Sequence, residues 1–493
     1  MPAELNRLTI LRLFFFFSAL ISGVVLVLLL LWRSEAESTV VFSYSAGRLI
    51  GAGVVAVAAL SMFWLALMRP KRHTAEKILS HLDQWLVRPG IATIVFYAAL
   101  LACILGIAIL TSLPHIQTAI FYPSLIPFIP FMWWLFGFGC LALIGLSLLS
   151  HAQSNTETIA ILLLILILIA GAWVHTSLWE TRRGDPTELD IFSVFREGAR
   201  LYNSTNPYER VLAGNLAENA DYATYLPVIY ILSWLTRAAG LSVFSDWLAL
   251  WQVIFLIFNL LIASALFLIP FRQRITIFFA VFAACFWFFN RWSADIAISN
   301  DYDFIPIFFL ILSVTLFDRH RLLSCLLLGL SIGLKHLSIF LLPVYLIWTW
   351  KESNPRSIKP VLSAGLAVIG IPLLVSLPFI VWNWRGFILS ILFSVTRNPS
   401  DTFEALSIDA LLGWSGLPAR IFLLGMIGLV YIVAWKEKVS RYLAALLFSA
   451  IIVDFNSVLY SSYFAWVIPF MILSASELLL LKKEKGTLSI TSK

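Results

Sequence analysis

A series of apolar runs, most of them about 20 residues long, limits what this chain can fold into. A helix of that length matches the ~30 Å hydrocarbon core of a bilayer. The composition agrees, because 60% of the 493 residues are hydrophobic and only 12% are charged, whereas charged residues make up about a quarter of soluble domains. The sequence therefore predicts an all-α, polytopic membrane protein with about 14 transmembrane segments. The predicted spans are 8–32, 46–68, 91–112, 125–149, 159–178, 247–270, 275–290, 303–317, 321–336, 337–350, 358–381, 418–435, 441–459 and 463–481.

The distribution of lysine predicts the orientation. Ten of the eleven lysines fall in segments that this span count places on the same side as both termini, and basic residues concentrate in cytoplasmic loops. We therefore expect a multi-pass protein with both termini cytoplasmic. The opposite side is periplasmic or extracytoplasmic in a prokaryote and lumenal in a eukaryote, and we favour the plasma (inner) membrane of a prokaryote. The net charge of +7 is spread over short loops, so it predicts no nucleic-acid partner.

Two regions are predicted along the chain. Residues 1–150 carry the first four predicted spans, and residues 151–493 carry the other ten together with the long polar segment. The first apolar run lacks a small-residue cleavage site and is expected to remain as a span. The four cysteines lie inside apolar runs without metal-ligand spacing, and we interpret them as small core residues: Cys103, Cys140, Cys285 and Cys325.

The segment 179–246 is the only long polar stretch, and the span count places it outside the membrane. It holds nine of the 27 acidic residues, six arginines and no lysine. A capping turn at Asp185 predicts a helix that runs through Tyr202, with Asp190 and Glu197 on one face. Both acids fit a solvated surface helix; alternatively, Asp190 is a general base held at the membrane surface. The following segment, Tyr225–Leu241, is predicted to be an amphipathic helix on the outer surface.

Lys335 and His336 stand in the middle of the apolar run 321–350, which is too long for one span. The run therefore predicts a helical hairpin that turns at these two residues. An ionisable residue inside a membrane segment is a functional hypothesis by default, and a lipid phosphate is a natural partner for this lysine. The alternative is that Lys335 extends its ammonium to the interface.

The turn 290–303 gathers three acids, an arginine and two asparagines between two spans. Arg291, Asn300 and Asp303 are its candidate substrate-binding residues, and Asp303 opens the next span. A polar inter-span turn is the alternative. The acids leave a divalent cation open, but no ligand spacing supports one, so we predict no metal ligand and no resident cofactor.

Several motifs occur in an order that resembles the GT-C superfamily of integral-membrane glycosyltransferases. The resemblance covers roughly 159–481 and is nearest to the family 87 polyprenyl-phosphate-mannose-dependent mannosyltransferases and the catalytic subunit of GPI mannosyltransferase I. The matching positions are Asp190, Asn206-Pro207-Tyr208, Tyr225-Leu226-Pro227, Gly329 to Lys335, and Phe464, Trp466 and Pro469. Ser299-Asn300-Asp301-Tyr302 replaces the Gly-Gln-x-Asn string of family 87, and Asn203-Ser204-Thr205 replaces the usual glycine. These departures leave the sugar and the family open.

The resemblance implies a transferase in which residues 1–150 are an accessory region and residues 151–493 are the catalytic module. Its site would be extracytoplasmic, on the large first loop of that module, residues 179–246. A sugar, with mannose as one candidate, would pass from a polyprenyl phosphate to a glycan, lipid or protein acceptor. Asp190 would be the catalytic base. Substrate-binding roles are then expected for Lys335, His336, Arg291, Asp303, Asn300, Asn206, Tyr208 and Tyr225.

Two other functions are compatible with the sequence. A polysaccharide polymerase or ligase that uses lipid diphosphate-linked glycans also has a large outer loop, but that loop is usually late in the chain and rich in Arg and His. A lipid or solute transporter would carry buried charges along a path and inverted repeats. The sequence shows no repeat, and its deep candidates are Lys335, His336 and Asp454.

Overall fold

The computed structural model describes ten ranges of the chain and a few isolated residues between them. The ranges are 7–31, 46–67, 156–179, 190–213, 223–273, 277–353, 357–396, 417–436, 439–455 and 461–491, and the isolated residues are 77, 81, 84, 275, 408 and 412. All regular structure in these ranges is helical, without any strand. The chain separates into two compact units, one of residues 1–174 with 289–291 and one of the remainder.

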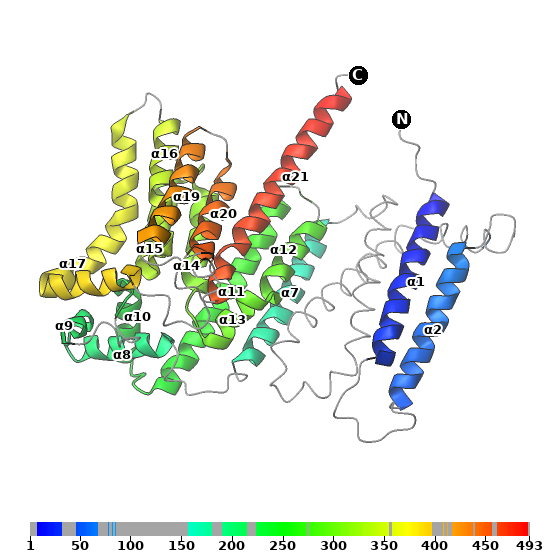
Figure 1. Ribbon diagram of the computed structural model, residues 1–493, viewed down its shortest axis with the longest axis horizontal. Helices are drawn as coiled ribbons and strands as arrows, with labels where there is room; N and C mark the ends of the chain where they lie inside the picture. Colours follow the sequence, from blue (N-terminus) through cyan, green and yellow to red (C-terminus); the bar gives the residue numbers. More distant parts are fainter. Residues whose placement is uncertain are drawn as a thin grey trace. The chain divides into compact units, whose positions relative to one another are not determined.

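The first unit contains α1 (Arg7–Leu31), α2 (Ala46–Leu67) and most of α7 (Thr156–Leu178) (Figure 1). Helices α1 and α2 pack against each other as a pair. Their bounds agree with the predicted spans 8–32 and 46–68 to within a residue. The predicted spans 91–112 and 125–149, with Cys103 and Cys140, lie outside the described residues.

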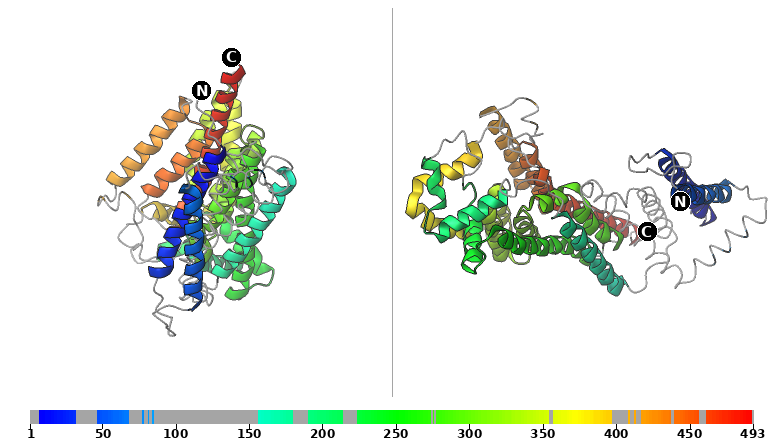
Figure 2. Two further views of the ribbon diagram at one scale, coloured as in Figure 1. Left: turned by 90° about the vertical axis from the view of Figure 1, so that its right-hand side faces the viewer. Right: turned by 90° about the horizontal axis from the view of Figure 1, so that it is seen from below.

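The second unit is a bundle of apolar helices that is crossed at one end by shorter ones (Figures 1 and 2). The bundle helices are α11 (Phe244–Arg272), α12 (Ile277–Phe289), α14 (Phe304–Leu316), α15 (Arg321–Leu334), α16 (Leu342–Glu352), α17 (Ile358–Thr396), α19 (Leu417–Trp435), α20 (Arg441–Asp454) and α21 (Ile468–Thr491). The remaining elements are α8 (Asp190–Tyr202), η3 (Pro207–Glu209), α9 (Arg210–Ala213), α10 (Pro227–Ala238), α13 (Arg291–Ser299), η5 (His336–Leu341) and η7 (Ser461–Trp466).

Helices α14, α15 and α16 run back and forth through the bundle. Ser313 of α14 and Ser324 of α15 each donate a side-chain hydrogen bond to the other's carbonyl oxygen, at 2.6 Å in both directions. The hydroxyl groups of Ser313 and Tyr345 of α16 are also 2.6 Å apart. Arg321 at the start of α15 pairs with Glu352 at the end of α16. The chain therefore reverses at Lys335, as the sequence predicted.

Three helices in the described part of the chain are long and apolar enough to cross a membrane: Phe244–Arg272, Ile358–Leu392 and Ser462–Leu480. Shorter apolar helices accompany them, including Ala160–Thr176, Phe304–Leu316 and Arg321–Leu334. The protein is therefore an all-helical membrane protein in its described part. The number of crossings stays a prediction.

Two segments differ from the sequence prediction. Residues 291–299, predicted as part of a turn, form the helix α13, and the turn is confined to the residues just before α14. Helix α17 continues to Thr396, well past the predicted end at 381, with a break at Asn383 (φ −156°, ψ 83°). The Asn383 side chain accepts a hydrogen bond from the Gly386 amide at 2.9 Å, so it caps a second helical piece immediately after the break.

The crossing helices are held by close packing. Helix α8 packs on α10, and α10 packs in turn on α15 and α17. A Cβ atom at Gly198 would collide with the Ser233 side chain, so glycine permits the close approach of α8 to α10. A Cβ atom at Gly333 would come within 2.9 Å of Val228 of α10. These contacts bring the polar loop against the end of the bundle where α15 breaks.

Candidate active site at the end of the helix bundle

Lys335 and Asp303 form a buried ion pair where α15 ends and α14 begins. The Lys335 Nζ lies 2.5 Å from Asp303 Oδ1, and the two side chains are only 6% and 0% exposed. The backbone at Lys335 is extended (φ −145°, ψ 117°), which ends α15 and turns the side chain away from the helix path. The lysine therefore points into the protein, and the predicted alternative of an ammonium extended to the interface is wrong.

Two tyrosine rings surround the Lys335 ammonium. Its Nζ lies 5.5 Å from the ring centroid of Tyr302 and 4.7 Å from that of Tyr463, distances at which a cation is attracted to the ring face. An ammonium has three donors, and Asp303 accepts one of them. Among the described residues, Asp303 Oδ2 and the Tyr302 hydroxyl are buried without a hydrogen-bond partner. The cluster therefore retains unused hydrogen-bonding capacity beside a positive charge.

Asp190 is joined to this cluster through Tyr225. The Tyr225 hydroxyl lies 3.5 Å from Asp190 Oδ2, and the Tyr225 ring packs edge-on against Tyr302 with centroids 5.4 Å apart. Asp190 itself is exposed at the first turn of α8. An exposed carboxylate and a buried lysine thus lie at the two ends of a short row of tyrosines.

Asp301 adds a further carboxylate. It follows Asn300, whose left-handed backbone (φ 55°) makes the sharp turn before α14, a conformation that asparagine tolerates better than most residues. Burial, with the negative charge of Asp303, raises the pKa of Asp301 to about 7, although Lys335 acts in the opposite direction. The Ser299 hydroxyl donates to Asp301 Oδ2 at 3.1 Å. This carboxyl group is therefore able to change protonation state near neutral pH.

Asn206 and Tyr208 build the loop that supports Tyr225. Asn206 Oδ1 accepts the Tyr208 amide hydrogen bond at 3.0 Å and so caps η3. The Tyr208 hydroxyl donates to the Tyr225 carbonyl oxygen at 2.8 Å, and its fully buried ring packs against Phe379 and Phe387 of α17. Both side chains hold the loop in place in this arrangement, and direct substrate binding by them stays a prediction.

The remaining predicted residues have varied positions. The Asn300 side chain accepts a hydrogen bond from Gln252 of α11 at 2.9 Å, which ties the turn to the bundle. His336 begins η5 directly after Lys335 and is half-buried. Arg291 begins α13, is exposed, and groups with the first compact unit. The structure therefore brings Asp190, Tyr225, Asp303 and Lys335 into one cluster.

Glu197 is not solvated, contrary to the surface-helix alternative. Its side chain is 0% exposed and lies near three arginines: Arg210 Nη2 at 2.8 Å, Arg196 Nε at 3.5 Å and Arg200 Nε at 3.6 Å. Desolvation raises the pKa of Glu197 even though the arginines oppose the shift. The periodicity of α8 placed Glu197 on a face, but it did not show that the segment around Arg210 covers that face.

Sequence reasoning did not select Asp301, Tyr302 and Tyr463 as site residues. Asp301 and Tyr302 stand between Asn300 and Asp303, two residues that were selected, and this proximity was the available signal. Tyr463 directly precedes Phe464 of the last matching motif, and only the fold places it at Lys335. In the described part of the chain, no three His, Cys, Asp or Glu side chains are grouped so that they could hold a metal ion.

Comparison with known proteins adds no relative. The chain matches no protein-family model, and neither the curated protein sequences nor the solved structures contain a match.

Proposed function

We propose that this protein is a GT-C-type membrane glycosyltransferase that transfers a sugar from a polyprenyl phosphate to a glycan, lipid or protein acceptor. The observation that carries the proposal is the arrangement of the cluster: exposed Asp190 is joined through Tyr225 and Tyr302 to buried Lys335. A base that faces an acceptor from solution, beside a cation for a lipid phosphate, is what this reaction requires.

In the proposed reaction, Asp190 takes the proton of the acceptor hydroxyl group. The acceptor oxygen forms a bond to the anomeric carbon of the donor sugar, on the face opposite the phosphate. The bond between that carbon and the phosphate oxygen breaks, and the polyprenyl phosphate leaves with the electron pair. Lys335 stabilises the negative charge that develops on the leaving phosphate.

The proposed topology follows from lysine distribution. It comprises about 14 transmembrane segments, cytoplasmic termini and an outer site, in the inner membrane of a prokaryote. A cysteine introduced at the exposed Thr205 should react with a membrane-impermeant maleimide in intact cells, and one introduced at the exposed Lys77 should not. Labelling at 77 with protection at 205 would reverse the orientation.

The activity is tested with purified protein and a panel of radiolabelled polyprenyl-phosphate sugars, mannose first, with the Asp190→Asn protein as the inactive control. Transfer of label from one donor to an acceptor, and its loss in the variant, is the expected result. If no sugar is transferred from any lipid-phosphate donor in the presence of total membrane acceptors, the proposal fails.

A transporter is the second candidate, and the buried Lys335–Asp303 pair favours it, because buried ion pairs in membrane helices often mark transport paths. Liposomes that contain the purified protein distinguish the two functions. Movement of a fluorescent lipid phosphate across the bilayer without sugar transfer would identify the transporter.

A further inference from the structure

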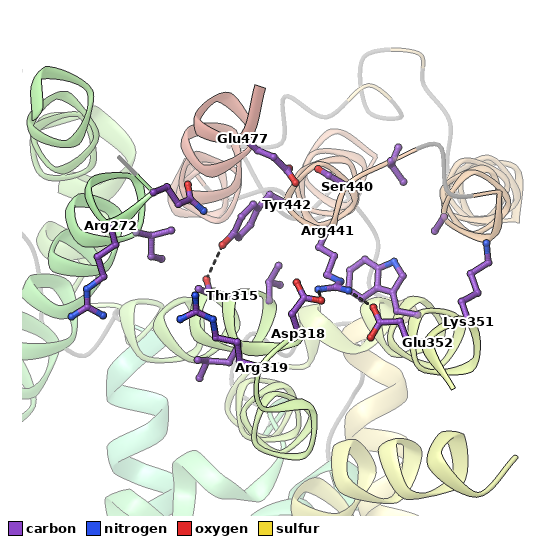
Figure 3. Close-up of a pocket in the computed structure, with 17 residues that line it drawn as sticks. Arg272, Thr315, Asp318, Arg319, Lys351, Glu352, Ser440, Arg441, Tyr442 and Glu477 are labelled. Atoms are coloured by element: carbon purple, nitrogen blue, oxygen red, sulfur yellow. Dashed lines mark hydrogen bonds and ion pairs between the residues drawn. The ribbon is translucent and has the colours of Figure 1, made fainter. Parts of the chain in front are cut away.

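A cavity of about 740 Å³ in the second unit, drawn in Figure 3, is lined by residues at the end of the bundle opposite to Lys335. None of the nine predicted site residues lines it. The cavity borders the last residues of α14, whereas Asp303 directly precedes the first residue of that helix. Helix α14 has 13 residues, and at a rise of about 1.5 Å per residue its two ends are ~20 Å apart. Its volume is in the range of small-molecule sites, ~300–1,000 Å³.

The cavity is built from the ends of helices, with charged residues at its mouth. Helices α11, α14, α16, α19, α20 and α21 contribute to it, and the first and last of these belong to the three helices able to cross a membrane. Charged side chains begin where these apolar helices end. For a bundle whose helices α11 and α21 cross the bilayer, this placement is the level of the lipid headgroups on one membrane surface.

Part of the lining charge is neutralised within the protein. Arg441 pairs with both Asp318 and Glu352, and Arg321 pairs with Glu352 from beside the cavity. The Tyr442 hydroxyl donates to Thr315 Oγ1 at 3.4 Å. This network closes one side of the cavity and leaves its charges satisfied.

Two lining arginines stand apart from this network. Arg272 and Arg319 have no carboxylate partner among the described residues, and they lie on the same side of the cavity in Figure 3. Glu477 of α21 forms no close salt bridge with a described residue, although its charge acts on Arg441. Gln273 Oε1 is buried without a hydrogen-bond donor. The cavity thus offers two guanidinium groups for an anion, and a carboxylate with an amide oxygen for a cation.

We propose that this cavity binds the headgroup of a phospholipid that carries both a phosphate and a primary amine, of the phosphoethanolamine type. The phosphate pairs with Arg272 and Arg319, because guanidinium groups match phosphate geometry. The ammonium donates hydrogen bonds to the Glu477 carboxylate and to Gln273 Oε1, which is otherwise without a donor. The acyl chains remain in the bilayer beside the apolar helices.

The test uses the purified full-length protein in detergent, with binding followed as a rise in melting temperature. The soluble probes are glycerophosphoethanolamine, glycerophosphocholine, glycerophosphate and inorganic phosphate. We expect glycerophosphoethanolamine to bind about tenfold more tightly than glycerophosphate, because only the former supplies the cation. Equal stabilisation by all four probes, or by none, would overturn the proposal.

Charge-neutral substitutions assign the two halves of the site. The Arg272→Gln/Arg319→Gln protein should lose binding of every phosphate probe, whereas Glu477→Gln should lose only the preference for the amine. Lys359→Gln is the matched control, because it removes an exposed cation at the start of α17 that does not line the cavity. It should change neither the binding of the phosphate probes nor the preference for the amine. Probe selectivity of the unmodified protein decides the question even if a variant fails to fold.

Lipid and soluble sources are separated by native mass spectrometry after reconstitution in nanodiscs. Retention of phosphatidylethanolamine over phosphatidylglycerol, lost in Glu477→Gln, supports a lipid ligand. Binding of the soluble headgroup without retention of the lipid would overturn the lipid assignment. Neither readout depends on sugar transfer, so failure here is distinct from failure of the proposed function.

Discussion

Lys335 and Asp303, 32 residues apart in the chain, form an ion pair from which water is almost wholly excluded. Removal of either partner of a buried ion pair destabilises the fold, because the other charge then remains buried without a counter-charge. The pair fixes the end of α15 against the start of α14. It also sets the position of the ammonium to which we assign the leaving phosphate.

Replacement of Lys335 should separate a structural from a functional role. Lys335→Ala leaves Asp303 unpaired and should lower the free energy of unfolding by ~3–5 kcal/mol, whereas Lys335→Met/Asp303→Leu should recover most of that loss. Both proteins should lose use of the lipid-phosphate donor. Melting temperature and donor kinetics are measured on the same samples, and a double variant that still transfers sugar at the normal rate would exclude Lys335 from phosphate stabilisation.

Asp190→Asn should reduce turnover by roughly 10²–10⁴-fold, because the amide cannot accept the acceptor's proton. The side chain is exposed, so melting temperature should not change. Donor binding should stay near normal. A fully active Asp190→Asn protein would move the base to Asp301 or Asp303.

Glu197→Gln should show the reverse pattern, with a loss of stability as its main effect. The carboxylate lies near three arginines in a buried position, and without it their charges repel one another. We expect a loss of about 2–3 kcal/mol, at or below the lower end of the range for a broken buried pair, because the arginines are partly exposed. Chemical denaturation in detergent measures the loss, and an unchanged midpoint would show that the cluster contributes no net stability.

Asp301 should make stability depend on pH. Its pKa is raised to about 7 in the fold, so the folded protein retains a proton that the unfolded chain releases near pH 4. The free energy of unfolding should therefore fall as pH rises from about 4 to about 7. Asp301→Asn should flatten that slope in melting curves recorded across this range, and an unchanged slope would assign the pH dependence to another group.

Gly329→Ala should destabilise the contact of α15 with α17. A Cβ atom at this position would overlap the Val368 carbonyl oxygen, which is backbone and unable to rotate away. We expect a cost of about 1–3 kcal/mol. Gly370→Ala in α17 is the matched control, because a Cβ atom there meets nothing within 4 Å, and it should be neutral or slightly stabilising. Equal melting temperatures for the two variants would contradict the close approach.

The sequence predicted the helical membrane class and several helix bounds from local information. Apolar length sets where a helix ends in a bilayer, which is why α1, α2, α11 and α14 agree closely with the predicted spans. The break at Lys335 was also predictable, because a charge in the middle of a long apolar run demands a turn or a partner. Asp190 was selected from its place in the motif order and from its position just after the predicted capping turn at Asp185.

Only the tertiary structure decided which groups share an environment. Periodicity assigned Glu197 to the same face as Asp190. In the structure, however, Arg210 pairs with Glu197 and covers it, whereas Asp190 stays exposed. Asp303 could be placed at the start of a span, but its pairing with Lys335 depends on the antiparallel return of α15. Burial and charge pairing are properties of contacts between segments distant in sequence, so local pattern limits the candidates and the packing of helices selects among them.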